Sequence, residues 1–281
     1  MKKFKFFLLT AIVCLAAFGA VAAQDSIVKT NLSQAEIDRI VKNFTTKEGE
    51  FRAALTQYVF NRSASISTIG LGGNITGTYR RDSFMSITPE GERREKILFA
   101  PISTLTEISV TPEDLEDLGG VNPFALEPSV VHLYNFTYVG KEKIDELDLY
   151  VFDVAPKVMP DPKKTKQRFF IGRIWIDDQD LQMVKSKGKA IPETKQNKFP
   201  VVETLRINID GKYWFPADSR SDDELVFDNG NVVKMKVRVK YTNYRQGKSE
   251  VKILDDVEEV KEETKPSPSP TPAPAPTPKK P

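Results

Sequence analysis

The hydrophobic period of this chain changes once, and that change limits the folds open to it. From Ser33 to Tyr58 apolar side chains recur every three or four residues, which is the spacing of one helix face. A capping box, Ser33-Gln34-Ala35-Glu36, marks where this helix begins. After Tyr58 the helical spacing ends, and segments rich in Thr, Ile, Val, Tyr and Phe follow. The sequence therefore predicts one long helix followed by strands.

The strand-like segments follow one another with turn sequences between them. They are 65–67, 75–88, 93–99, 147–154, 169–176, 201–209 and 232–244, with further strands expected after Val139 and after the 177–180 turn. Asn229-Gly230 predicts a two-residue type I′ hairpin turn that sets Val226 opposite Val233. Short inserted helices are expected after Thr111 and after Asn122. About nine consecutive strands imply an α+β fold with an antiparallel sheet curled around the helix.

The two ends of the chain differ from the region between them. Residues 1–23 combine Lys2, Lys3 and Lys5, an apolar run of about a dozen residues and a small-residue site ending in Ala23, which together predict an export signal peptide cleaved after Ala23. Residues 255–281 are acidic and then Pro-rich, a composition that buries no core and predicts a disordered tail or spacer. The folded domain is expected within 24–254, exported to the periplasm or cell envelope of a bacterium.

Charge and cysteine content narrow the possible partners. Lys and Arg together number 41 and Asp and Glu 39, and three of the lysines lie in the predicted signal peptide. A nearly neutral mature chain lacks the basic surplus that nucleic-acid binding or attraction to anionic membranes requires. Cys14, the single cysteine, is also in the signal peptide, so the mature domain must be held by core burial alone.

The chain is poor in groups that do catalysis. His132 is the single histidine, no Gly-x-Ser-x-Gly elbow occurs, and one imidazole without cysteine cannot build a zinc site. The acids of 177–180 and of 222–224 are interpreted as turn and strand-surface residues rather than calcium ligands or a glycosidase pair. We therefore expect no enzyme activity, no metal and no cofactor.

The remaining candidate for a functional site is apolar surface. Several strands are apolar on both faces, so a curled sheet could hold an apolar cavity suited to a lipid or acyl chain. The candidate ligand-binding residues are large apolar groups on central strands: Phe152, Ile174, Trp175, Met183 and Trp214. The alternative is a filled core in an envelope protein-interaction or structural domain carried on the Pro-rich spacer. The sequence does not decide between these two possibilities.

Four segments carry a resemblance to a known superfamily: 138–145, 150–157, 172–177 ending in Trp175-Ile176-Asp177, and 211–216. They resemble LolA/LolB-like proteins, which include outer membrane lipoprotein-sorting proteins and the N-terminal domain of RseB-type stress sensors. The resemblance covers about residues 33–253. The chain departs from the classical carriers because Arg80-Arg81-Asp82 is the nearest match to their Arg-Pro-Gly strand start, and because it adds the Pro-rich tail.

The resemblance implies an open half-barrel of nine to eleven antiparallel strands, with helices covering its concave side. It also implies a non-catalytic carrier or sensor that binds lipids or lipoprotein acyl chains. Apart from the resemblance, we expect a monomer, with an envelope protein as the alternative partner.

Overall fold

The computed structural model describes residues 27–88, 92–111, 114, 126–165 and 167–247. The predicted signal peptide and the predicted tail lie outside these ranges, as do most of the two predicted inserted helices. The chain divides into two compact units, 1–249 and 250–281, and the description below concerns the first. In the described part of the chain, no helix combines the length and apolar character needed to cross a membrane.

One long helix opens the domain, as predicted. α1 (Gln34–Leu55) begins at Ser33, whose side chain accepts a hydrogen bond from the Glu36 N–H while the Glu36 carboxylate accepts one from the Ser33 N–H. The helix runs without a break through Gly49 and ends three residues before the predicted Tyr58. Tyr58 instead opens the first strand.

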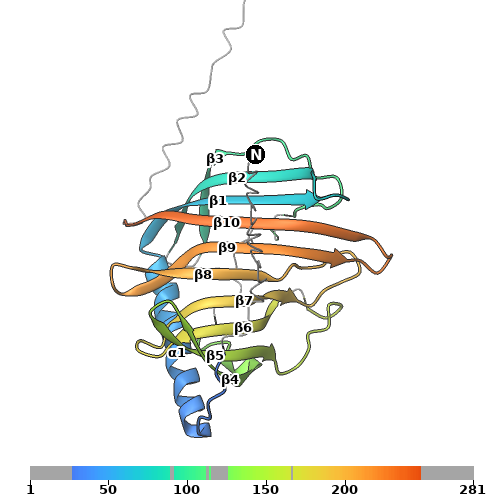
Figure 1. Ribbon diagram of the computed structural model, residues 1–281. Coiled ribbons are helices and arrows are strands. Elements are labelled where there is room, and N and C mark those ends of the chain that lie inside the picture. Colours follow the sequence, from blue (N-terminus) through green and yellow to red (C-terminus); the bar gives the residue numbers. More distant parts are fainter. Residues whose placement is uncertain (1–26, 89–91, 112–113, 115–125, 166, 248–281) are drawn as a thin grey trace, which may run out of the picture. The chain divides into compact units, whose positions relative to one another are not determined.

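Ten strands form a single antiparallel sheet in the order β3-β2-β1-β10-β9-β8-β7-β6-β5-β4 (Figure 1). Every strand except the two at the edges lies between neighbours, and the edges β3 and β4 do not pair, so the curled sheet stays open. This confirms the predicted α+β half-barrel. The strands are β1 (Tyr58–Ile69), β2 (Ile75–Ile87), β3 (Arg93–Phe99), β4 (Tyr134–Ile144), β5 (Leu147–Pro156), β6 (Phe169–Asp177), β7 (Met183–Ile191), β8 (Val202–Ile209), β9 (Tyr213–Val226) and β10 (Val232–Gln246).

The β9–β10 turn differs from the prediction by one residue of register. Val226 pairs with Val232, not Val233, and a longer loop with Gly230 at φ 83° replaces the two-residue turn. The observed register sets Glu224 opposite Lys234 and Asp222 opposite Lys236. It also sets buried Leu225 opposite buried Val233, so that the apolar residues of both strands share one face, which explains the shift.

α1 crosses the strands on one face of the sheet, which we call the helix face (Figure 1). Its C-terminal half packs on β1, β9 and β10 through Phe51 and Leu55, and its N-terminal half packs on β5 and β6 through Ile40 and Phe44. A third apolar cluster lies on the opposite, outer face: Leu149, Val151, Trp175 and Val184 are its buried members. Successive residues of a strand point to opposite faces, so β5 and β6 contribute buried apolar side chains to both faces of the sheet.

Candidate functional site

A cavity of about 490 Å³ lies on the helix face. Its floor runs across neighbouring strands, from Ile66 on β1 through Leu225 and Met235 to Ile174 on β6. The volume falls within the range of about 300–1,000 Å³ that is usual for small-molecule sites. The lining is predominantly apolar and the cavity is partly open.

The hollow follows from the size of the side chains along the sheet. The central strands contribute small groups to this part of the floor: Ser186, Gly188 and Ala190 from β7, and Val202 and Thr204 from β8. The flanking strands contribute Met235, Phe170 and Ile174, which are large. The floor thus has large side chains at its two sides and small ones at its centre, which leaves space that the sheet cannot fill.

Two glycines place Phe170 at the side of this floor. Gly172 and Gly188 pair directly across β6 and β7. A Cβ atom on Gly188 would stand 2.5 Å from Phe170 Cε2, and one on Gly172 would stand 2.9 Å from Phe170 Cζ. Since carbon atoms do not approach so closely, the paired glycines are what allow the ring to lie against the sheet.

One half of the roof is the segment 103–111, which we call the strap. Thr104 anchors it to β2 through a hydrogen bond from its N–H to the Thr78 carbonyl (2.9 Å) and one from the Thr78 N–H to its hydroxyl (2.9 Å). A Cβ on Gly77 would lie 2.7 Å from the Thr104 carbonyl oxygen, so the strap passes over a position that needs glycine. Beyond this anchor, Ile108 and Val110 pack on the core and line the cavity.

The other half of the roof is the loop 192–200 between β7 and β8. Its own hydrogen bonds shape it: the Thr194 N–H donates to the Asn197 carbonyl, and the Phe199 N–H donates to the Glu193 carboxylate. Gln196, Asn197, Lys198 and Phe199 line the cavity from this side. The loop is therefore an ordered wall of the cavity.

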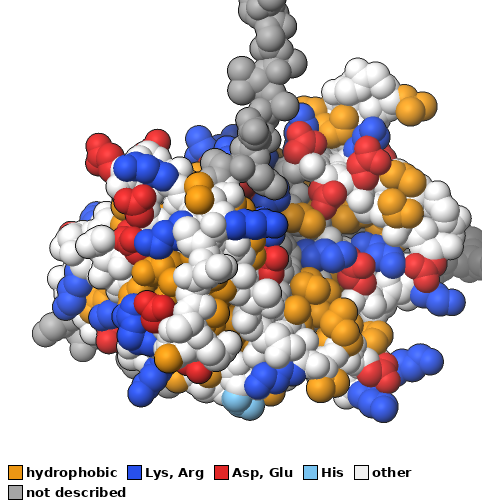
Figure 2. All heavy atoms as spheres, turned by 60° about the horizontal axis from the view of Figure 1, so that its bottom comes forward, with side chains coloured by type: hydrophobic (Ala, Val, Ile, Leu, Met, Phe, Trp, Pro, Cys, Tyr) orange, Lys and Arg blue, Asp and Glu red, His pale blue; other side chains and the backbone are white. Residues whose placement is uncertain are grey.

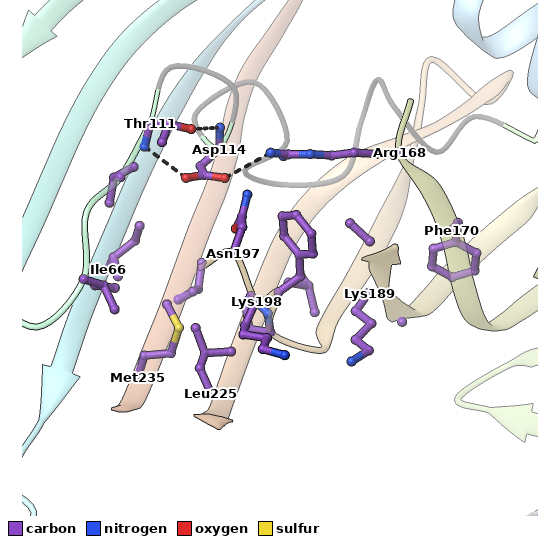
Figure 3. Close-up of a pocket in the computed structure, with 18 of the residues that line it drawn as sticks. Ile66, Thr111, Asp114, Arg168, Phe170, Lys189, Asn197, Lys198, Leu225 and Met235 are labelled. Atoms are coloured by element: carbon purple, nitrogen blue, oxygen red, sulfur yellow. Dashed lines mark hydrogen bonds and ion pairs between the residues drawn. The ribbon is translucent and has the colours of Figure 1, made fainter. Parts of the chain in front are cut away.

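Arg168, just before β6, contacts Asp114 next to the strap (Figure 3) and also the 192–200 loop. Its Nη2 lies 3.4 Å from the Asp114 carboxylate, which accepts a hydrogen bond from the Thr111 N–H (3.0 Å). Its guanidinium also lies over the Phe199 ring, 4.6 Å from the ring centre. A cation over an aromatic face is attracted to it, so Arg168 links the strap side to the loop.

A buried ion pair marks the inner boundary between the cavity and α1. Arg206, which lines the cavity, donates two hydrogen bonds to Glu48 of α1 at 2.6 and 3.0 Å, and Glu48 is 1% exposed. The Arg206 guanidinium also lies 4.6 Å from the centre of the Phe51 ring. Paired in this bidentate way, the buried carboxylate is satisfied.

The five residues predicted to bind ligand separate between the two faces. Ile174 and Met183 line the cavity, and Phe152 is fully buried in the same apolar cluster without lining it. Trp175 and Trp214 lie on the outer face, where their indole N–H groups donate to Glu142 (2.6 Å) and Asp180 (2.9 Å). Strand alternation explains this separation, because Trp175 follows Ile174 and Trp214 precedes Phe215 of the helix face.

Most of the lining residues were not among the predicted ligand-binding residues. The large apolar ones that were missed include Ile66, Phe170, Leu225, Met235 and Val237 of the sheet, Ile108 and Val110 of the strap, and Phe199 of the loop. Strand parity relative to Ile174 was a usable signal for Phe170. No local pattern places the strap or the loop over the sheet, because their positions depend on contacts far apart in the sequence.

The acidic groups considered as calcium ligands or as a glycosidase pair include several with structural partners. Asp177 accepts hydrogen bonds from the Gln179 and Asp180 N–H groups, and burial, with the neighbouring Asp180 carboxylate, raises its pKa. Asp222 and Glu224 form ion pairs with lysines of β10. His132 is exposed in a short 3₁₀ turn. Among the described residues, no three His, Cys, Asp or Glu side chains gather as a metal site.

The surface carries both signs of charge. Figure 2 shows Lys, Arg, Asp and Glu interspersed with hydrophobic side chains across the face it presents, without a field of one sign. Cross-strand ion pairs also join opposite charges on neighbouring strands, including Arg173 with Asp153 and Arg220 with Glu203.

No family model and no curated protein matches the sequence. Among solved structures, the chain is similar to a DUF1329 family protein from Desulfovibrio piger (14% identity, 77% of this chain and 95% of that chain covered, TM-score 0.34). It is also similar to an outer membrane lipoprotein-sorting protein domain from Vibrio parahaemolyticus, with 11% identity, 71% of this chain and 91% of that chain covered, and a TM-score of 0.31. A third similar structure is that of MucB, with 12% identity, 70% of this chain and 92% of that chain covered, and a TM-score of 0.23.

Proposed function

We propose that this protein binds a lipid or acyl chain non-covalently in the cavity on the helix face, and that it acts as a carrier or sensor in the bacterial cell envelope without catalysis. The observation that carries the proposal is the cavity itself: about 490 Å³, with a floor of apolar and small side chains. Burial of an acyl chain in such a site is favourable by about 0.8 kcal/mol for each methylene removed from water.

The alternative function, an envelope interaction or structural domain with a filled core, finds less support. It requires the helix face to be packed throughout, whereas α1 covers one part of that face and the cavity occupies another. The cavity therefore favours ligand binding over a purely structural role.

The first test is native mass spectrometry of the protein purified from its own envelope, followed by extraction and lipid analysis. We expect a stoichiometric lipid or acylated peptide. The delipidated protein should then take up a fluorescent fatty acid. A clean apo mass together with no uptake would contradict the proposal.

A pair of matched serine variants locates the site. Ser186→Phe places a ring on the cavity floor and should weaken fatty-acid uptake about tenfold or more, since the added ring occupies the space of the ligand. Ser65→Phe makes the same chemical change on the outward-facing parity of β1, next to Ile66 of the lining. It should leave uptake unchanged. Equal loss in both variants would place binding elsewhere.

A further inference from the structure

The floor of the cavity has an end at β6, and an aromatic ring lies there. The floor residues come from β1, β10, β9, β8, β7 and β6, which are consecutive in the sheet. Neighbouring strands are about 4.8 Å apart, so the floor spans roughly 24 Å before the curl of the sheet shortens the path. Ile66 of β1 and Phe170 of β6 lie at opposite sides of this floor (Figure 3). A hydrocarbon chain laid across the strands therefore meets Phe170.

Phe170 is held between the cavity and the packed core. Its side chain lines the cavity, is 5% exposed and belongs to the same apolar cluster as Phe44 of α1. Its N–H donates a hydrogen bond of 3.1 Å to the hydroxyl of Tyr134, which fixes the backbone from which the ring projects. Lys189 also lines this end of the cavity, but its charge is paired with Glu193 at 2.8 Å. The β6 end is thus closed by a fixed apolar wall.

The residues beneath this ring could not fill its place. The ring lies over the pair Gly172 and Gly188, where added Cβ atoms would stand 2.9 and 2.5 Å from ring atoms of Phe170. Ala190, which pairs with Phe170 across β6 and β7, is also small. A shorter side chain at position 170 would therefore leave open space, because surrounding structure relaxes only partly into a vacated site. The size of the ring sets how far the cavity extends at this end.

We propose that Phe170 is the end wall of the acyl-chain site and sets the greatest chain length that the protein binds in full. The hydrocarbon chain lies across the strands and its end contacts the Phe170 ring. Methylenes beyond that length stay in water and add no affinity, since only surface removed from water contributes. This inference rests on the proposed function and adds a specificity-determining residue.

The test measures the affinity of the full exported chain, after delipidation, for saturated fatty acids of increasing length. Decanoate, dodecanoate, tetradecanoate, hexadecanoate, octadecanoate and eicosanoate compete with a fluorescent fatty acid. The affinity should rise about fourfold for each methylene that enters the cavity and should stop rising once the chain reaches Phe170. The chain length at which the rise stops is the limit to be compared between variants. A rise that continues through the whole series would overturn the proposal.

Two variants should move this limit in opposite directions. Phe170→Leu removes the ring and should shift the limit to longer chains, with about fourfold higher affinity for each methylene newly buried. Ala190→Leu adds a side chain to the floor opposite Phe170 and should shift the limit to shorter chains. Phe84→Leu makes the matched change on the outward-facing parity of β2, outside the lining, and should leave the limit unchanged. Ala190→Leu keeps the proposal falsifiable if Phe170→Leu fails to fold.

The outcomes distinguish the two proposals. Opposite shifts of the limit in the two variants support the end-wall assignment, because a general loss of stability would not lengthen the preferred chain. An unchanged limit in either folded variant overturns that assignment and leaves the acyl-binding proposal standing. Absence of binding for every fatty acid of the series overturns both.

Discussion

The helix face of one sheet is filled in one region and hollow in another. Beneath the C-terminal half of α1, the rings of Phe51, Tyr58, Tyr213 and Tyr244 surround Phe215, with ring centres 4.8 to 6.0 Å apart. Over the small side chains of β7 and β8, by contrast, the strap and the 192–200 loop roof an open space. The backbone pattern is the same in both regions, so side-chain size and the covering element decide whether the face is core or cavity.

The largest expected effect contrasts the two regions directly. Phe215→Ala removes a fully buried ring at the centre of the filled region and should lower the free energy of unfolding by about 4 kcal/mol. Val202→Ala trims a half-buried lining residue beside existing space and should cost less than about 1 kcal/mol. Urea denaturation of both variants measures the difference. Equal costs would mean that the cavity wall is as tightly packed as the aromatic region.

The boundary between the regions gives the second prediction. Glu48→Gln leaves the Arg206 charge mostly buried without its carboxylate, which should destabilise the protein by about 3 kcal/mol. Replacing both residues with apolar groups, Glu48→Leu with Arg206→Met, should recover most of this loss, because no unpaired charge then remains. Denaturant unfolding of the single and double variants measures both changes in the free energy of unfolding. A double variant as unstable as the single one would show that the pair is needed for packing rather than for charge.

The third prediction concerns Glu203, on the outer side of the sheet below the cavity floor, and its expected effect on stability is smaller. Burial alone would raise the pKa of Glu203, but a hydrogen bond from Arg220 and the charges of Lys185 and Arg220 outweigh it and hold the pKa below its usual range. A folded-state pKa below the unfolded value stabilises the protein above the unfolded pKa, and this contribution disappears as the pH falls through the folded pKa.

Glu203→Gln should therefore flatten the acid side of the stability–pH curve while changing stability at pH 7 by no more than about 1 kcal/mol, since Arg220 is half-exposed. Thermal melts between neutral and acidic pH measure the slope. The matched control is Glu224→Gln, whose partner Lys234 is also half-exposed and whose effect should be smaller still. An unchanged acid slope in Glu203→Gln would assign the acid sensitivity to other carboxylates.

Local patterns predicted the long helix and most strands of one antiparallel sheet, but they extended the helix to Tyr58, which opens β1. The capping box at Ser33 set the start of α1, and alternation along 232–244 set the buried face of β10. The β9–β10 register was missed by one residue because Asn229-Gly230 suits two loop geometries, and the observed one sets buried Leu225 opposite buried Val233. For the site, two of five candidates line the cavity, since choosing by size ignores which face a strand residue points to.

The sequence by itself determined the order of one helix and then strands, the antiparallel sheet and the scarcity of catalytic groups, because these depend on local period, turn residues and composition. The tertiary structure alone decided that the small side chains of Ser186, Gly188 and Thr204 would share one floor, and that the strap and Arg168 would roof it. The physical reason is distance along the chain: Asp114 and Arg168 are 54 residues apart, and no local signal encodes a contact that only the folded sheet creates.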